Sequence, residues 1–183
     1  RVICRDLPGD DEDAQARFLH AEVAGLRVMC AYVPNGREVG TEAFAYKLRW
    51  LDRLRRYLGD QADPSQPLAL VGDFNIAPET RDVHDPDAYA GQVHFHPDEH
   101  ARLADLCAWG LEDAFRLHHQ DAGLYSWWDY RQLGFPKNRG LRIDLILLTA
   151  SLAEACSDVR IDRDERKGKK PSDHAPVIAE LDW

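Results

Sequence analysis

The chain has 183 residues, of which 32 are acidic and 23 are Lys or Arg, so its formal net charge is −9. This balance excludes a generic basic nucleic-acid coat protein. The content of 44 % hydrophobic and 30 % charged residues excludes an intrinsically disordered chain. The length predicts one domain with a sizeable core rather than two thin domains.

The strand-like segments are runs of β-branched and aliphatic residues that alternate with helical or loop-like stretches. They lie at about 18–24, 26–33, 68–72, 141–148 and 176–181. This order predicts a mixed α/β fold.

Two helices are expected between these strands. The first covers residues 42–58, where apolar residues recur at steps of three and four, and Gly59 is a natural stop. Its Lys and Arg side chains, from Lys47 to Arg56, are interpreted as a solvated face. The second covers residues 97–109, opened by a proline and ended by a glycine.

Two polar segments have no clean period. Residues 77–96 are rich in Asp, Pro and Gly, and we expect a surface loop beside a functional site. Residues 162–173 form a second connection that is locally positive. Histidines in and after the first loop suggest a zinc site, but Pro97 interrupts their spacing, so structural roles are favoured. This group is His94, His96 and His100, and the pair His118 and His119 is expected at the surface.

The four cysteines, Cys4, Cys30, Cys107 and Cys156, are widely spaced and form no C-x-x-C pair. We interpret them as small core residues rather than as part of a zinc ribbon or a redox motif. No stretch approaches the roughly 20 apolar residues of a membrane span, and no apolar N-terminal segment is present. A cytoplasmic protein with no membrane partner is therefore expected.

The first candidate for chemistry follows the apolar run 68–71, which stops at Gly72 and then presents Asp73 and Asn75. Alternation along a strand puts these two side chains on one face, where they can bind one phosphate group or its attacking water. The alternative is a strand-end turn in which both satisfy backbone groups.

The second candidate is Asp144, which shares the polar face of an apolar strand with Arg142. A charge in such a strand needs a partner, and a histidine is one, because a carboxylate fixes the tautomer and orientation of an imidazole. The alternative is a surface ion pair.

The third candidate is the adjacent pair Asp173 and His174, just before the last strand. Adjacent side chains diverge, so a hard oxygen ligand for Mg²⁺ and an imidazole facing a phosphate oxygen are a plausible division of labour. Alone, the Ser-Asp-His run is a weak signal and favours a structural turn. The three segments together, with Asp73, Asn75 and Asp144, suit metal-assisted hydrolysis of a phosphoester.

Six motifs in order resemble the motif set of the exonuclease III and apurinic/apyrimidinic (AP) endonuclease family, in the endonuclease/exonuclease/phosphatase superfamily. They are Tyr32-Val33-Pro34-Asn35-Gly36, Gly72-Asp73-Phe74-Asn75, Trp109-Gly110-Leu111-Glu112-Asp113, Ser126-Trp127-Trp128-Asp129-Tyr130-Arg131, Asn138-Arg139-Gly140-Leu141-Arg142-Ile143-Asp144 and Ser172-Asp173-His174-Ala175-Pro176. No single motif is specific, whereas six in the right order are.

The resemblance implies a four-layer α/β sandwich with two mixed sheets flanked by helices. It implies a Mg²⁺-dependent enzyme, with Mn²⁺ as an alternative, that acts as a monomer on double-stranded DNA with 3′ ends or abasic sites. The implied activities are 3′–5′ exonuclease, abasic-site endonuclease and clearing of blocked 3′ termini.

The resemblance also implies residue roles. The catalytic set is Asp73, Asn75, Asp144, His174 and Tyr32, and the metal side is Asp173 with Asp73 and Asn75. DNA-binding roles fall on Asn35, Trp127, Tyr130, Arg131 and Arg139, with Trp127 near the pocket for a flipped abasic sugar. A positive rim for DNA is expected from Lys137, Arg139, Arg142, Arg166, Lys167, Lys169 and Lys170.

The resemblance covers roughly the C-terminal two thirds of a family enzyme. We therefore expect residues 1–183 to be a single, N-terminally truncated domain that lacks the family's early metal-ligand Glu. Two alternatives to an active nuclease stay open. One is a catalytically impaired fragment or DNA-binding member, and the other is a superfamily phosphatase on non-nucleic-acid substrates.

Overall fold

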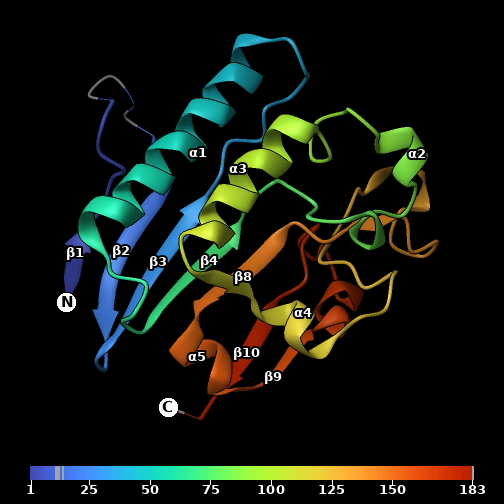
Figure 1. Ribbon diagram of the computed structural model, residues 1–183. Coiled ribbons are helices and arrows are strands. Elements are labelled where there is room, and N and C mark those ends of the chain that lie inside the picture. Colours follow the sequence, from blue (N-terminus) through green and yellow to red (C-terminus); the bar gives the residue numbers. More distant parts are fainter. Residues whose placement is uncertain (11–12, 14, 183) are drawn as a thin grey trace.

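A mixed α/β architecture is present in the computed structural model, which describes residues 1–10, 13 and 15–182. Across this part of the chain, the strands form a six-stranded sheet in the order β1-β2-β3-β4-β8-β5 and two small sheets, β9-β10 and β6-β7 (Figure 1). The strands are β1 Val2–Cys4, β2 Phe18–Val23, β3 Leu26–Tyr32, β4 Leu68–Asp73, β5 Leu111–Asp113, β6 Trp127–Trp128, β7 Gly140–Leu141, β8 Asp144–Thr149, β9 Cys156–Ile161 and β10 Val177–Leu181. The helices are α1 Glu42–Gln61, α2 Pro86–Tyr89, α3 Pro97–Ala108, α4 Ala114–His118 and α5 Ala150–Glu154, with 3₁₀ turns at Thr80–Asp82, Arg131–Leu133 and Arg163–Lys167.

The order of the central strands determines where polar side chains meet. β3 and β4 are parallel, joined by α1, while β8 runs antiparallel to β4. The carboxyl ends of β3 and β4 and the amino end of β8 therefore lie at one edge of the sheet. Tyr32 pairs with Asp73, and Asp73 pairs with Asp144.

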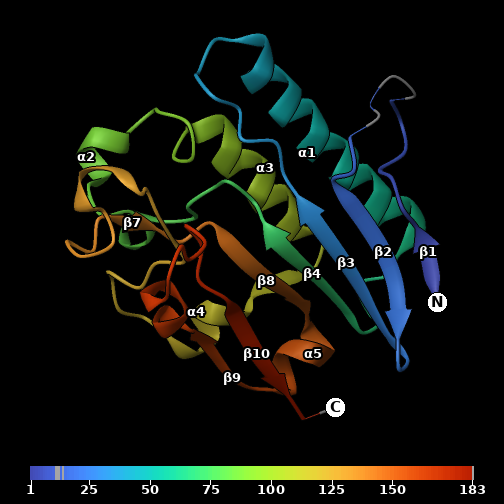
Figure 2. The ribbon, with the colours of Figure 1, turned by 180° about the vertical axis from the view of Figure 1, so that it is seen from behind.

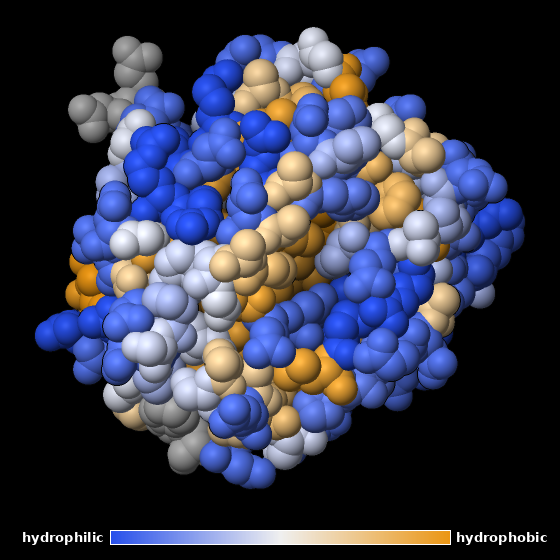
Figure 3. Space-filling model, in the orientation of Figure 1, coloured by the Kyte–Doolittle hydropathy of each residue, from blue (hydrophilic) through white to orange (hydrophobic). Residues whose placement is uncertain are grey.

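The main core lies between this sheet and helices α1 and α3, which cover one face of it (Figure 1). On the other face, β9 and β10 lie over the β8 side, and a second cluster of apolar residues packs there with α4 and α5 (Figure 2). The surface on the helical side is mostly hydrophilic (Figure 3). Because both faces of the sheet are covered, the sheet edge that carries Asp73 lies between two packed layers.

Helix α1 differs from the expectation in two ways. It continues past Gly59 to Gln61, and its end is capped by the N–H of Ala62 on the carbonyl of Leu58. Its basic residues do not all face water, because Lys47 and Arg53 are buried. The solvated-face interpretation is therefore wrong for these two side chains. Arg53 is held by Asp13 and by backbone carbonyls of the segment before β2.

The expected strand 141–148 is interrupted. It divides into β7 and β8 at Arg142 and Ile143, because the Arg142 guanidinium is drawn into a buried ion-pair cluster described below. The loop 77–96 contains a 3₁₀ turn and α2, and its Asp82 is fully buried. Strand β9 was not anticipated, because its two buried residues, Cys156 and Val159, are three positions apart and the polar Ser157 and Asp158 lie between them.

The four cysteines are free thiols, and only some are core residues. Cys156 is buried, Cys4 and Cys107 are intermediate, and Cys30 is exposed, so the core interpretation is wrong for Cys30. Its side chain alternates with the buried Met29 and Ala31 on β3. No helix within the described residues is long and apolar enough to cross a membrane.

Candidate active site

Two carboxylates face each other where β4 ends and β8 begins. Asp73 and Asp144 are directly opposed in the antiparallel pair. Gly72, just before Asp73, lets β4 lie close to β3, since its φ is +137° and a Cβ there would lie 2.0 Å from the carbonyl oxygen of Ala31. Like charges directly opposite in a sheet are destabilising, so this pair needs a neutralising group.

His174 supplies part of that neutralisation. Its Nδ1 lies 2.8 Å from Oδ2 and 3.0 Å from Oδ1 of Asp144. Its Nε2 lies 4.0 Å from Oδ2 of Asp73. Burial lowers the pKa of His174, but the hydrogen bond and charge of Asp144, with the charges of Asp73 and Asp173, raise it above its ordinary value. The contact expected between Asp144 and a histidine is thus present, and Nε2 is turned toward Asp73.

The Asp73 carboxyl lies in an unfavourable environment for a negative charge. Burial and the nearby Asp144 raise the pKa of Asp73 to about 6, against the opposing effects of the Asn75 N–H, His174 and Lys47. The ligand atoms of Asp73, Asp144 and His174 lie within 4.8 Å of one another. Two hard carboxylate oxygens with excess negative charge fit a divalent cation such as Mg²⁺ or Mn²⁺.

This cluster lies at the wall of a pocket of about 730 Å³. Apart from the three cluster residues, the pocket is lined mainly by β4, β8 and the segment from Pro171 to Val177. A cavity of this size with convergent polar groups is typical of a ligand site.

Asn75 joins the site through a turn, not through strand alternation. It lies beyond β4 with a left-handed φ of +52°. Its Nδ2 donates to Oδ2 of Asp73 at 3.0 Å and to the carbonyl of Val33, and its N–H donates to Oδ1 of Asp73. Its Oδ1 accepts Nδ2 of Asn35 at 3.1 Å. The sequence-based pairing of Asp73 with Asn75 is therefore present, and Asn35 joins it.

Asp173 takes a different direction from His174. Its Oδ2 accepts the indole N–H of Trp127 at 3.0 Å, and its carbonyl accepts the N–H of Trp128. Asp173 is not part of the three-residue cluster above. Tyr32 is half exposed at the end of β3, with the Arg17 guanidinium 4.7 Å from its ring centroid. The roles of both residues stay predictions.

Residues expected to bind DNA gather around a second, polar pocket of about 320 Å³. Trp127, Arg131 and Arg139 line it, together with His84 and Tyr89. The neighbouring Tyr130 is exposed, and its hydroxyl donates to the carbonyl of Pro171 at 2.6 Å. The Trp127–Asp173 hydrogen bond connects this pocket to the segment that carries His174.

The expected positive rim loses two members. Arg142 and Arg166 are buried and unavailable to DNA phosphates. Arg166 donates to the carbonyl of Ser172 and lies against the rings of Tyr130 and Phe135. The rim residues that are exposed are Lys137, Arg139, Lys167, Lys169 and Lys170.

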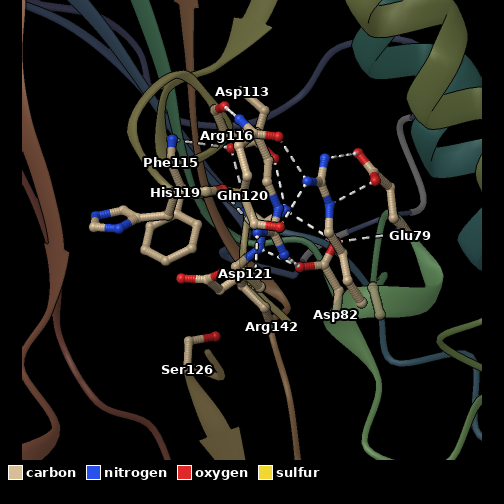
Figure 4. Close-up of polar contacts among 12 residues, drawn as sticks. Glu79, Asp82, Asp113, Phe115, Arg116, His119, Gln120, Asp121, Ser126 and Arg142 are labelled. Carbon is tan, nitrogen blue, oxygen red and sulfur yellow. Dashed lines mark hydrogen bonds and ion pairs between the residues drawn. The ribbon is translucent and has the colours of Figure 1, made fainter. Parts of the chain in front are cut away.

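Arg142 instead occupies the centre of a buried ion-pair cluster (Figure 4). It donates from Nε and Nη2 to the carboxylate of Asp82, and from Nη1 and Nη2 to that of Asp113. Arg116 binds Asp82 as well. Arg142 lies between β7 and β8, directly before Ile143 and two residues before Asp144. The ion pairs of Arg142 bend the chain there, so the cluster determines where β8 begins.

The histidines of the loop and α3 each serve a structural contact. His94 Nδ1 lies 2.7 Å from the carbonyl of Asn75, His96 caps α3, and His100 Nε2 lies 2.9 Å from the carbonyl of Ala77. Burial and the Lys47 charge lower the pKa of His94 to about 4. His118 is exposed as expected, whereas His119 is only partly exposed, because it packs on Phe115 with Nε2 at 2.5 Å from the carbonyl of Val159.

Sequence reasoning missed three supporting residues, Lys47, Glu99 and Ser126, which are all fully buried. A weak signal existed for Glu99 alone, because it follows a proline in the first turn of α3, where a capping-box carboxylate is expected. Lys47 and Ser126 carry no local signal, since their partners lie far along the chain.

The chain is similar to known proteins of one family. The model of the endonuclease/exonuclease/phosphatase family matches residues 3–174. Exodeoxyribonuclease III of Haemophilus influenzae is 41 % identical over 99 % of this chain, and the zebrafish (Danio rerio) DNA repair nuclease APEX1 is 31 % identical over 92 %. The chain spans 72 % and 53 % of the lengths of these relatives, and 65 % of a Bacillus subtilis exodeoxyribonuclease.

Solved structures give the same grouping. A 3′ phosphatase from Neisseria, NExo, bound to a product DNA hairpin, is 38 % identical with a TM-score of 0.95, and the match covers 98 % of this chain and 70 % of that one. An AP endonuclease from Archaeoglobus fulgidus is 36 % identical with a TM-score of 0.91, covering 95 % and 68 %. The chain belongs to the exonuclease III and AP endonuclease family of the endonuclease/exonuclease/phosphatase superfamily, and it is homologous to exodeoxyribonuclease III phosphodiesterases.

Proposed function

We propose that this chain carries the catalytic centre of a divalent-metal-dependent DNA repair nuclease that hydrolyses phosphodiester bonds. The observation that supports this most directly is the cluster of Asp73, Asp144 and His174 at one sheet edge, in a chain homologous to exodeoxyribonuclease III. The proposed substrate is double-stranded DNA with 3′ ends or abasic sites, and the proposed activities are 3′–5′ exonuclease and abasic-site endonuclease.

The proposed work of the residues is positioning and charge stabilisation. Asp144 holds Nδ1 of His174, so the imidazole presents Nε2 toward a phosphate oxygen beside Asp73. Asp73, held by the N–H and carboxamide of Asn75, handles the proton of the attacking water or of the leaving oxygen. Tyr32 is proposed to contact the same phosphate from the end of β3.

A divalent cation would be held by the carboxylates of Asp73 and Asp144, with Asp173 and Asn75 as further proposed oxygen donors. When bound, it would neutralise charge on the scissile phosphate. Mg²⁺ is the proposed ion, with Mn²⁺ as an alternative. The raised pKa of Asp73 fits this assignment, because a cation would relieve the repulsion between the two opposed carboxylates.

The DNA-binding surface is proposed to run from Asn35 past the site to the polar pocket. Trp127 would face an abasic sugar, with Tyr130, Arg131 and Arg139 on the flanking backbone. The exposed Lys and Arg residues of the rim would contact phosphates and make binding sensitive to salt.

The wider organisation follows the same proposal. Residues 1–183 would form a single domain and belong to a four-layer sandwich in which the sheet of β9 and β10 is the second sheet. We propose a monomer with no membrane partner in the cytoplasm, where the four free cysteines stay reduced.

Removal of a 3′ phosphate is a second candidate activity. It is supported by the 38 % identical Neisseria structure described as a 3′ phosphatase. One site can serve both reactions, since each breaks the bond between phosphorus and the 3′ oxygen of a deoxyribose.

The test is incision of a labelled duplex that bears one abasic-site analogue, beside a duplex with a 3′-phosphate end. Each is incubated with the chain in Mg²⁺ and in chelator, and with an Asp73→Asn, His174→Ala double variant. Metal-dependent cutting that the variant lacks is expected. A folded chain that processes neither duplex in Mg²⁺ or Mn²⁺ would contradict the proposal and favour a fragment without catalysis.

A further inference from the structure

A lysine ammonium is buried directly beneath the site. Lys47 lies in the second turn of α1, and its side chain has 0 % exposure. Its Nζ donates to the carboxylate of Glu99, to the carbonyl of Asn75 at 2.7 Å and to the carbonyl of Asn35 at 3.3 Å. All three N–H bonds of the ammonium therefore have acceptors, as a buried cation requires.

Two of these acceptors are backbone carbonyl oxygens of site residues, Asn35 and Asn75. Asn75 has a left-handed backbone, which directs its carbonyl to Lys47 while its carboxamide bonds to Asp73. Asn35 likewise gives its carbonyl to Lys47 and its carboxamide to Asn75. The ammonium thus holds the loops after β3 and β4 together from below, and their polar side chains point to the site.

Glu99 holds the ammonium in place and has no contact with the site. Its side chain has 0 % exposure, and its two oxygens accept the N–H groups of His94 and His96 as well as Lys47. The His94 ring bonds to the same Asn75 carbonyl at 2.7 Å, so this one oxygen is held by two donors.

A purely structural ion pair would also need acceptors for all three N–H bonds of the ammonium, but none of these acceptors would have to belong to a site residue. Buried pairs of this kind are replaceable by uncharged residues at little cost in stability, whereas breaking one partner alone is costly. Here the ammonium donates two of its three hydrogen bonds to the loops that carry Asn35 and Asn75. These acceptors indicate that Lys47 fixes the geometry of the two loops.

We propose that Lys47 is a positioning residue of the site, whose buried ammonium fixes the backbones of Asn35 and Asn75 so that both carboxamides and the Asp73 carboxylate keep one arrangement. The catalytic part of this inference rests on the proposed nuclease function. The geometric part concerns the loops themselves and is measurable without substrate.

The test uses a charge-balanced double variant, Lys47→Met with Glu99→Gln, which removes both charges together and limits the loss of stability. Its matched control is Arg49→Met with Glu42→Gln, which removes an exposed ion pair of the same helix. For each protein we would record the melting temperature, the ¹H–¹⁵N signals of the Asn35 and Asn75 carboxamides, Mn²⁺ affinity by calorimetry, and incision kinetics.

The expected result is a folded Lys47 variant in which the two carboxamide signals shift or broaden and Mn²⁺ binds more weakly. Its kcat would fall by about 10²-fold with a smaller change in KM, the loss associated with a misplacement of about 1 Å. The Arg49 control would match the wild-type chain. A folded Lys47 variant with unchanged carboxamide signals and Mn²⁺ affinity would overturn the proposal.

A measurement on the wild-type chain keeps the test independent of whether the variant folds. The ammonium protons of Lys47 should exchange slowly with water and show cross-relaxation to the Asn75 backbone. Rapid exchange would overturn the proposal. If the wild-type chain cuts no DNA while the carboxamide signals still depend on Lys47, the nuclease assignment fails and the positioning role stands.

Discussion

The Ser126 hydroxyl accepts the backbone N–H of Asp144 at 3.1 Å, and the carbonyl of the same serine accepts the N–H of Ala175 at 2.7 Å. The hydroxyl also accepts the N–H of Ile143 at 3.1 Å. A single buried residue therefore holds the chain beside both members of the Asp144–His174 pair. The contact between the carboxylate and the imidazole depends on this shared support as well as on their own attraction.

We predict that Ser126→Ala destabilises the fold by about 1–3 kcal/mol, because it leaves the buried N–H of Ile143 and the part-buried N–H of Asp144 without this acceptor. Urea unfolding measures this directly. Ser151→Ala, at an exposed serine, is the matched control and should change the free energy of unfolding by less than about 0.5 kcal/mol. Equal effects of the two substitutions would show that the Ser126 hydroxyl does not contribute this stability.

Binding of a divalent cation should stabilise the folded chain. A ligand at 100 times its Kd adds about 2.7 kcal/mol to the free energy of unfolding, so Mg²⁺ or Mn²⁺ should raise the melting temperature and chelator should reverse the gain. Asp144→Asn should lose this response, because it removes one of the two opposed carboxylates. The exposed Asp87→Asn should keep it, and a response retained by both variants would place the cation elsewhere.

Arg142→Met should be among the most destabilising single substitutions in the chain. It would leave the buried carboxylate of Asp82 without its bidentate partner, and breaking a buried ion pair costs about 3–5 kcal/mol. Arg160→Met removes an arginine whose pair with Glu180 is exposed, so it should lower the free energy of unfolding far less. Chemical denaturation of both variants makes the comparison, and similar losses would mean that the cluster is solvated.

Trp127→Ala should weaken incision at an abasic site more than it weakens the fold. The indole is half-buried at the polar pocket, and its N–H holds Asp173 beside His174. Kinetics on the abasic duplex and thermal melting of the same variant give the two values. Parallel losses of activity and stability would show that Trp127 acts only by packing.

The class of fold and the principal polar cluster could be predicted from the sequence because their signals are local. Apolar runs that stop at Gly72 and begin again after Asp144 mark strand ends, and strand ends in a mixed sheet bring carboxylates together. The contact between Asp144 and His174 followed from the need of a charged group for a partner.

The support beneath the site could not be predicted in this way. Lys47 lies on a helix whose other basic residues are mostly solvated, and only the tertiary fold brings it to Glu99, 52 positions away. The same holds for Arg142, whose partner Asp82 is 60 positions away in a segment that is polar enough to suggest a surface loop. The sequence around a charged residue does not show that it will be buried, because the tertiary fold determines which partner it meets.

The last prediction concerns acid stability and involves a histidine far from the site. His20 is buried on β2, with Nδ1 at 3.0 Å from the hydroxyl of Tyr57, and Nε2 has no hydrogen-bond partner within the described residues. Burial, and to a smaller extent the charge of Arg27, lower the pKa of His20 below 6.5. The unfolded chain therefore binds the proton more readily, so the contribution of His20 to stability is present above pH 6.5 and is lost as the pH falls below it.

The melting temperature of His20→Gln should fall less than that of the wild-type chain between pH 7 and about pH 5. His118→Gln, at an exposed histidine, should follow the wild type. Identical pH profiles for His20→Gln and the wild-type chain would show that His20 is protonated as easily in the folded chain as in the unfolded one.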